Sequence, residues 1–151
     1  MTIKTKDYLL VTVQFLLFIL YLINPLDIYI STPIYLHYLA LLTAAIGLIV
    51  LLLSIYALQK SISPFPSPKK NAILIDSGVY KYIRHPIYTA ILLSTFGWAI
   101  YSGSLFRIIV FITLFLLFEI KSTFEEKLLI AKYPNYLNYK KTTGKYFPKI
   151  N

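Results

Sequence analysis

Four long apolar stretches dominate the hydrophobic pattern of the chain, at residues 8–26, 34–58, 86–101 and 105–120. The first three contain no Asp, Glu, Lys or Arg, and a helix needs roughly 20 apolar residues to cross the hydrocarbon core of a bilayer. The pattern therefore predicts an all-α, polytopic membrane protein in which residues 1–151 form a single domain with four transmembrane helices.

The last two stretches are joined by Ser102-Gly103-Ser104, a sequence typical of a tight turn, so we expect them to form a helical hairpin. From Phe118 to Lys132 the chain contains neither Gly nor Pro and is rich in residues that favour helices. The fourth helix should therefore continue into the cytosol as a helical extension and end before Pro134.

A proline-rich segment separates the second stretch from the third. Residues 60–76 contain Pro64, Pro66 and Pro68, which exclude a regular helix there. We expect an extended loop that runs along the membrane surface. Its lysines could contact anionic headgroups, or the loop could fold over a bound cofactor, and both interpretations stay open.

Composition agrees with a membrane protein and narrows the chemistry. Hydrophobic residues make up 58% of the chain, against about 45–50% in soluble domains, and the mean hydropathy is +0.67. The chain has no cysteine, which excludes disulfides, a catalytic thiol and cysteine-based metal sites. Its two histidines are too few for a histidine-rich metal site, so we expect no metal.

The distribution of charge predicts the orientation. The net charge is +9, which in a membrane protein indicates topology and attraction to anionic lipid, and we do not expect nucleic-acid binding. Residues 60–84 carry five Lys or Arg against one Asp, and the segment from Glu119 onward carries seven Lys against three Glu. The positive-inside rule then places both termini in the cytoplasm.

The segment Ser77–Tyr88 is the richest in candidate chemistry. Pro86 is favoured in the first turn of a helix, so Arg84 and His85 should lie at a helix N-terminus at the membrane edge. Free N–H groups and the positive end of the helix dipole suit a carboxylate or phosphate there. We interpret the segment as a cradle for an anion or a cofactor at the lipid–water boundary.

Two blocks of residues resemble a known enzyme family. The first is Gly-x-Tyr-x-x-x-Arg-His-Pro-x-Tyr at Gly78–Tyr88, and the second combines EEKLL at 125–129, YLNY at 136–139 and GKYFP at 144–148. In order and spacing they resemble the isoprenylcysteine carboxyl methyltransferases. These belong to a wider group of integral-membrane methyltransferases that includes phospholipid methyltransferases. The resemblance covers roughly residues 70–150.

The resemblance implies S-adenosylmethionine as cofactor, bound on the cytoplasmic side by residues within about 70–90 and 119–148. It places Lys121, where the family has an arginine, at the substrate end, and it makes Lys121, Glu125 and His85 the candidate catalytic residues. The implied cofactor-binding residues are Ala72, Ile73, Leu74, Ile75, Tyr80, Arg84, His85, Pro86, Ile87, Tyr88 and Glu125. Spacing alone leaves a structural alternative, because Lys and Glu four residues apart also form ordinary ion-paired helix faces.

The implied reaction is methyl transfer to a lipophilic acceptor that enters from the bilayer, with the carboxylate of an isoprenylcysteine as the first choice. That acceptor is already ionised at neutral pH and needs no general base. A phospholipid or other lipophilic amine must lose a proton, and His85 or Glu125 would be the base. Two alternatives come from other classes: a non-catalytic protein that binds anionic lipid or a partner helix, and a nicotinamide-dependent membrane reductase, which the short length disfavours.

Overall fold

The computed structural model describes residues 2–26, 28–58, 63–69 and 73–149. Within these residues the regular structure is helical, as the apolar pattern predicts. It consists of α1 (Ile3–Ile23), α2 (Ile34–Leu58), the short 3-10 helix η2 (Gly78–Lys81), α3 (Pro86–Ser102), α4 (Leu105–Lys132) and α5 (Tyr136–Thr142).

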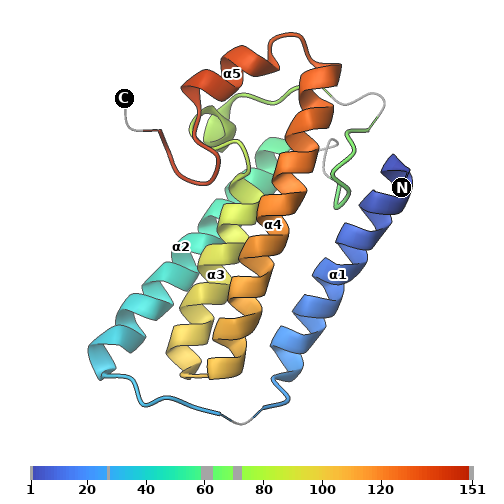
Figure 1. The fold of residues 1–151 in the computed structure, drawn as a ribbon. Coiled ribbons are helices and arrows are strands. Elements are labelled where there is room, and N and C mark those ends of the chain that lie inside the picture. Colours follow the sequence, from blue (N-terminus) through green and yellow to red (C-terminus); the bar gives the residue numbers. More distant parts are fainter. Residues whose placement is uncertain (1, 27, 59–62, 70–72, 150–151) are drawn as a thin grey trace.

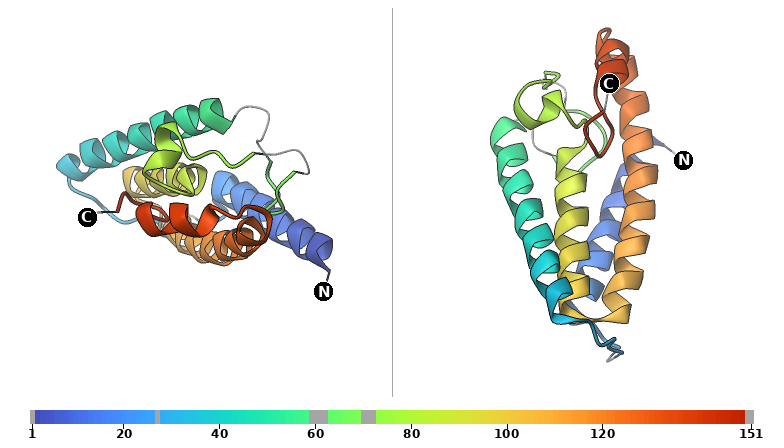
Figure 2. Two further views of the ribbon diagram at one scale, coloured as in Figure 1. Left: turned by 90° about the horizontal axis from the view of Figure 1, so that it is seen from above. Right: turned by 90° about the vertical axis from the view of Figure 1, so that its left-hand side faces the viewer.

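The four long helices lie side by side in the order α2, α3, α4, α1 (Figure 1). The largest interface joins α2 and α3, and α1 packs on α4. At the lower end α3 and α4 are joined by a tight turn and α1 and α2 by a longer loop, whereas η2, α5 and the segment after α5 gather at the upper end (Figure 2). Segments that are distant in sequence therefore meet at one end of the bundle.

Two glycines allow α2 and α3 to pack closely. A Cβ on Gly47 would lie 2.4 Å from Ser94 Oγ, and a Cβ on Gly97 would lie 2.5 Å from the carbonyl oxygen of Ala40. Small residues at such positions let helix backbones approach each other in membranes. This contact fixes α3, and with it the segment that precedes α3, against α2.

The predicted hairpin and the predicted extension are both present. Gly103 has φ 63° and ends α3, and the Ser104 side chain caps α4 by accepting a hydrogen bond from the Arg107 amide. The Ser104 hydroxyl also donates to Asn24 Oδ1 at 2.7 Å, which connects the end of α1 to the hairpin. Helix α4 then runs without interruption to Lys132, immediately before the Tyr133-Pro134 pair.

Helix α1 begins earlier than the apolar pattern predicts. It starts at Ile3 and not near residue 8, because the Thr2 side chain accepts a hydrogen bond from the Thr5 amide and caps the helix. It ends at Ile23, where Asn24 adopts a left-handed conformation. The polar residues before the first apolar stretch are therefore helical, and they turn Asp7 into the bundle, where it is buried.

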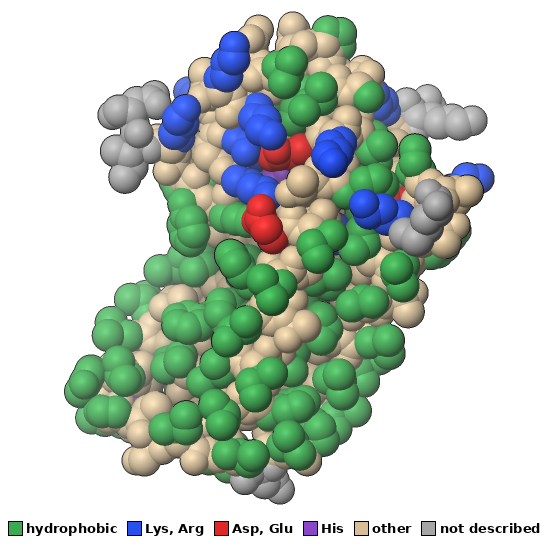
Figure 3. Space-filling view, viewed as in Figure 1, with side chains coloured by type: hydrophobic (Ala, Val, Ile, Leu, Met, Phe, Trp, Pro, Cys, Tyr) green, Lys and Arg blue, Asp and Glu red, His purple; other side chains and the backbone are tan. Residues whose placement is uncertain are grey.

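Length and composition qualify α1 and α2 as membrane-spanning helices. Only 28% of the apolar window of α1 and 17% of that of α2 are buried within the protein, so neither resembles the core helix of a soluble domain. Figure 3 shows apolar side chains over the lower part of the molecule and Lys and Arg side chains around the upper part. This division is the one expected of an integral membrane protein with one polar end.

Candidate active site

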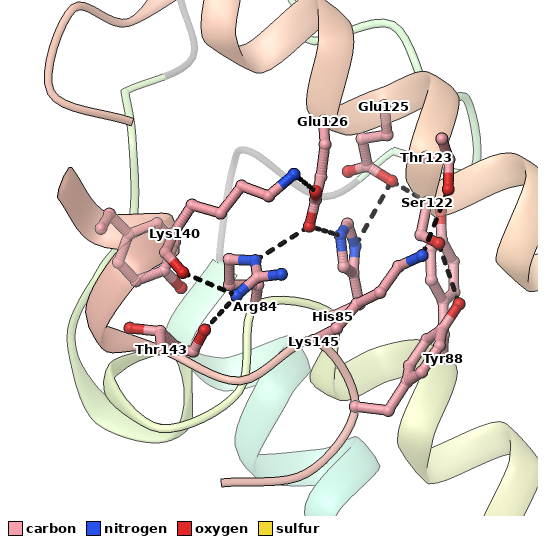
Figure 4. Close-up of polar contacts among 12 residues, drawn as sticks. Arg84, His85, Tyr88, Ser122, Thr123, Glu125, Glu126, Lys140, Thr143 and Lys145 are labelled. Atoms are coloured by element: carbon pink, nitrogen blue, oxygen red, sulfur yellow. Dashed lines mark hydrogen bonds and ion pairs between the residues drawn. The ribbon is translucent and has the colours of Figure 1, made fainter. Parts of the chain in front are cut away.

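A cluster of four charged or ionisable side chains, which we call the Glu126 cluster, lies at the polar end of the bundle (Figure 4). Glu126 Oε1 lies 2.8 Å from Arg84 Nε and 3.3 Å from His85 Nε2, and Glu126 Oε2 lies 2.6 Å from Lys140 Nζ. The Arg84 guanidinium also donates to the backbone carbonyls of Lys140 and Thr143. The cluster thus connects α4, α5 and the residues that precede α3.

The electrostatics of the cluster stabilise an ionised carboxylate. Burial alone would raise the pKa of Glu126, but its hydrogen bonds from His85, Lys140 and Arg84 lower that pKa well below the usual range. Its side chain is 6% exposed, and that of Arg84 is 7% exposed. Glu126 is therefore a buried anion whose acceptor positions are occupied by protein donors.

The backbone joins the two sequence blocks directly. The Arg84 and His85 amides donate to the carbonyls of Gly144 and Lys145 at 2.8 and 3.1 Å, and the Gly144 amide donates to the Tyr82 carbonyl at 3.2 Å. A Cβ on Gly144 would lie 1.7 Å from the Phe147 carbonyl oxygen, so the turn that follows requires glycine. The sequence predicts that both blocks lie on one side of the membrane, and here they form one unit.

Glu125, the neighbour of Glu126, has a different environment. It accepts a hydrogen bond of 2.8 Å from the Tyr88 hydroxyl, and it lies 3.8 Å from His85 Nδ1. The Tyr88 ring stacks between His85 and Phe118, with ring centroids 5.4 and 4.7 Å away. Burial raises the pKa of Glu125 above its usual value of 4.5, and the carboxylate lines the two cavities described next.

The first of these, which we call the tyrosine cavity, lies between α4, α5, η2 and the proline-rich loop. The Ser67 hydroxyl in its wall is buried and has no hydrogen-bond partner among the described residues. Burial raises the pKa of Tyr80, Tyr136 and Tyr139, so these phenols remain neutral. The cavity lining includes Ser67, Ile73, Leu74, Ile75, Tyr80, Arg84, Glu125, Tyr133, Tyr136 and Tyr139.

The second, the lysine cavity, shares Tyr80, Arg84 and Glu125 with the first and adjoins it. Its far wall contains Lys121, which is 1% exposed. The Lys121 ammonium donates to Gln14 Oε1 at 2.5 Å and to the Pro64 carbonyl at 2.8 Å. The lining of the lysine cavity also includes His85, Pro86, Ile87, Tyr88 and Ile91.

The structure brings the sequence-predicted site residues together around these two cavities. Ile73, Leu74 and Ile75 line the tyrosine cavity, and His85, Pro86, Ile87, Tyr88 and Lys121 line the lysine cavity. Ala72 lies outside the described residues. The described residues 63–69 and 73–75 of the proline-rich loop line the tyrosine or the lysine cavity, so the interpretation that this loop folds over a cofactor stays a prediction.

Sequence reasoning missed two residues. It assigned no role to Glu126, because the four-residue spacing from Lys121 favours Glu125, although Glu126 pairs with Arg84. It also left α1 as an apolar span, although Gln14 bonds to Lys121. A signal existed for Gln14, which is the one strongly polar side chain in the apolar stretch before Asn24. A buried amide in such a stretch needs a partner.

Comparison with known proteins defines the class. The sequence model of the phospholipid methyltransferase family matches residues 35–136, which include α2, η2, α3 and α4. The chain belongs to this family of membrane methyltransferases, which is part of the wider group that its two blocks resemble.

The chain is also similar to the cobalt-zinc-cadmium resistance protein CzcN of Cupriavidus metallidurans. The two sequences are 30% identical over 86 residues, which cover 56% of this chain and 40% of that protein. The chain therefore matches less than half the length of this relative.

Methyltransferases of the family generally use S-adenosylmethionine, and the lining of the tyrosine cavity contains groups that suit its chemistry. It presents a carboxylate, an ammonium, ribose hydroxyls and an adenine. The tyrosine cavity offers aromatic rings, the unpartnered Ser67 hydroxyl and the Glu125 carboxylate as hydrogen-bonding groups. Among the described residues no cluster of His, Asp and Glu could hold a metal ion.

Proposed function

We propose that this protein transfers a methyl group from S-adenosylmethionine to a lipophilic acceptor at the membrane. The observation that carries the proposal is the position of Glu125 at the junction of two unlike cavities. One cavity has an aromatic wall that suits the methyl donor. The other has a buried lysine and opens among apolar helices, which suits an anionic, lipophilic acceptor.

The donor would bind mainly in the tyrosine cavity. Glu125 would accept hydrogen bonds from its ribose or ammonium, and the Tyr80, Tyr136 and Tyr139 rings would enclose the adenine. Because burial keeps these phenols neutral, Tyr80 and Tyr136 can donate hydrogen bonds without adding charge, whereas the Tyr139 hydroxyl already donates to the Tyr80 carbonyl. The remaining contacts would come from Ile73, Leu74, Ile75, Arg84, His85, Pro86, Ile87 and Tyr88, and also from Ala72.

The acceptor we favour is the carboxylate of an isoprenylcysteine-type molecule, held by Lys121. When bound, the donor supplies a methyl group on a sulfonium: a lone pair of the carboxylate oxygen forms the new C–O bond, the C–S pair remains on sulfur, and no proton is released. The residues of the chain then have to align the two groups and exclude water. Lys121 orients the acceptor oxygen, and the loop at Pro64 covers it.

A lipophilic amine is the alternative acceptor, and the name of the matched family favours it. An ammonium must lose a proton before it can attack, and the base would be Glu125 or His85, which lie within 3.8 Å of each other. The buried Lys121 ammonium repels a second cation in the lysine cavity, which is why we rank the carboxylate first.

The proposed enzyme has four spans, with both termini and the active site in the cytoplasm. Two helices qualify as spans by themselves. The α3–α4 hairpin, in which α4 continues past the apolar region, supplies the other two. The basic side chains around the polar end support its placement on the cytoplasmic side by the positive-inside rule (Figure 3).

The test is calorimetric binding of S-adenosylmethionine and of its demethylated product to the purified protein in detergent. Glu125→Ala should weaken binding by about ten- to a hundredfold, the loss of a hydrogen bond to a charged group. Glu119→Ala is the matched control, because Glu119 is a glutamate on the same helix that lies outside both cavities. No binding by the folded parent protein would favour the non-catalytic alternative, in which the basic face binds anionic lipid.

A further inference from the structure

Helix α1 lies outside the region that the family match covers, residues 35–136, yet it reaches the lysine cavity. We propose that α1 selects the acceptor: Gln14 positions Lys121 for an anionic headgroup, and the groove between α1 and α3 binds the hydrocarbon chain of the same molecule. This inference rests on the proposed methyltransferase function and adds to it the recognition of the acceptor.

The headgroup end depends on the neutral partners of Lys121. Gln14 is 7% exposed although it lies in the middle of an apolar helix, and its side-chain oxygen accepts from Lys121 Nζ. The second acceptor is a backbone carbonyl, that of Pro64. Among the described residues no carboxylate lies within ion-pair distance of Lys121, although Glu125 and Asp7 are close enough to influence it electrostatically.

Burial lowers the pKa of Lys121 to about 8, so at neutral pH its side chain is mostly an ammonium, held by neutral oxygens. Its charge remains available to a ligand, whereas the charge of Arg84 or Lys140 is matched by the carboxylate of Glu126. A buried cation without an anionic partner is costly. An acceptor carboxylate or phosphate that enters the lysine cavity would supply the missing charge, so the cavity favours anionic headgroups.

The chain end of the proposed site lies further along the same two helices. Gln14 and Ile91 line the lysine cavity, and one turn later Phe18 on α1 and Thr95 on α3 line a separate groove. This groove has a volume of about 420 Å³, within the roughly 300–1,000 Å³ that is usual for small-molecule sites. It is lined by Phe18, Tyr21, Leu22, Ser94, Thr95, Trp98 and Arg107.

The far end of this groove is defined by Tyr21. Its hydroxyl donates to the Thr95 carbonyl at 2.5 Å, and Arg107 Nε donates to the Tyr21 carbonyl at 3.3 Å. These bonds connect α1 to both helices of the hairpin. A hydrocarbon chain anchored at Lys121 would therefore lie between α1 and α3 and extend toward Trp98.

A second apolar groove is the natural competitor for the chain. It lies between α3, α4 and the segment after α5, and its lining includes Phe96, Phe115 and Phe147. No Lys, Arg, Asp or Glu contributes to that lining. Lys145 lies over the ring of Tyr146, which lines this groove, but its ammonium is already paired with Glu119. Lys121 has no carboxylate within ion-pair distance among the described residues, which is why we assign the acceptor to the α1–α3 groove.

Trp98 gives a direct test, because it is the one tryptophan in the chain and lines the α1–α3 groove. Dibromostearate is a fatty carboxylate whose chain carries two bromine atoms, and bromine quenches tryptophan fluorescence. In detergent it should quench Trp98, and the matched dibrominated alcohol should quench Trp98 much less. Lys121→Met should remove this difference. A double variant, Trp98→Phe with Phe96→Trp, moves the tryptophan to the competing groove and should show no headgroup-dependent quenching.

Equal quenching by carboxylate and alcohol, or stronger quenching of the tryptophan at position 96, would overturn the proposal. Failure of the underlying methyltransferase function is recognised separately. If the parent protein binds neither S-adenosylmethionine nor its demethylated product, the proposed function fails whatever the fluorescence shows. If donor binding is intact and quenching is independent of the headgroup, only the assignment of the acceptor site fails.

Kinetics separate a positioning role of Gln14 from a structural one. Gln14→Glu keeps the oxygen that Lys121 contacts but neutralises its charge. It should raise KM for a farnesylated cysteine carboxylate by about tenfold or more without a matching change for an amine acceptor in vesicles of phosphatidylethanolamine. The control is Thr12→Leu, an exposed polar position on the same helix, which should alter neither value. Equal losses for both acceptors would show that Gln14 acts on stability alone and would overturn the proposal.

Discussion

Glu125 and Glu126 are adjacent on α4, yet they belong to two regions with opposite properties. Glu126 is buried and receives hydrogen bonds from Arg84, His85 and Lys140. Glu125 receives one from Tyr88 and otherwise borders the two cavities. In the region of Glu126 the carboxylate is paired with cations of the protein. In the region of Glu125 the carboxylate borders two cavities and can contact a ligand. The comparison indicates that Glu126 holds the parts of the site together, whereas we expect Glu125 to contact the ligand.

The largest effect should come from Glu126→Ala. It leaves Arg84 buried without its anion, and removal of one partner of a buried ion pair costs about 3–5 kcal/mol. The thermal unfolding temperature in detergent should fall strongly, and donor binding should fall with it. Glu125→Ala should show the opposite profile, with binding lost and unfolding temperature nearly unchanged. If both variants lose stability equally, the proposed division between the two regions is wrong.

Gly144→Ala should have the next largest effect on stability. The added Cβ would lie 1.7 Å from the Phe147 carbonyl oxygen, so the turn has to move, at a cost of about 1–3 kcal/mol. Because the Arg84 amide donates to the Gly144 carbonyl, the movement should loosen the Glu126 cluster. Proteolysis of the segment after α5 should become faster. Thr142→Ala, an exposed neighbour, serves as the control, and unchanged proteolysis of the Gly144 variant would contradict the expectation.

Glu125 and Glu126 should become protonated at different pH values as the solution is acidified. Burial raises the pKa of Glu125 above 4.5, so its carboxylate should be protonated first and donor affinity should fall first. The pKa of Glu126 is lowered by its donors against the effect of burial. The stability it contributes is fully present above the unfolded-state pKa and is lost only as pH falls through the lower folded-state value.

The contribution of Glu125 to stability depends on pH in the opposite direction. Its raised pKa favours the folded state below the unfolded-state value near 4.5, and this contribution is lost as pH rises through the folded-state value. Calorimetry of the demethylated product and circular dichroism, both followed from neutral pH downward, check the order. Loss of affinity and of helical signal at one and the same pH would contradict it.

The smallest effect should come from Glu119→Ala, outside both regions. Glu119 pairs with Lys145, but its side chain is 47% exposed, and exposed ion pairs contribute about 0–1 kcal/mol. Unfolding temperature and donor affinity should both stay close to the parent values. A large loss of affinity in this variant would show that negative charge on α4 matters in general, and not Glu125 in particular.

The sequence predicts the helices well because their signals are local. The apolar stretches, the Gly103 turn and the run from Phe118 to Lys132 without Gly or Pro define elements that appear nearly as expected. The start of α1 was wrong by about one turn because a single side chain, Thr2, caps it.

The site is predicted less completely because its decisive contacts are distant in sequence. The family resemblance of the two blocks identifies Glu125, Lys121 and His85 as candidates, and the structure gathers them around one pair of cavities. It cannot identify the partner of Lys121, since Gln14 lies 107 residues away. Nor can it show that Glu126 binds Arg84, because these two residues lie 42 positions apart.

The backbone pairing between Arg84 and Gly144 has a consequence for biosynthesis. Helices α1 to α4 can enter the membrane as they are made, but the α5 wall of the tyrosine cavity and the backbone pairing of Arg84 and His85 form only when α5 and the residues around Gly144 leave the ribosome and fold back. During translation the four long helices are thus made before the tyrosine cavity is complete. In the methyltransferase that we propose, donor binding therefore begins only after the residues around Gly144 have folded onto the segment before α3.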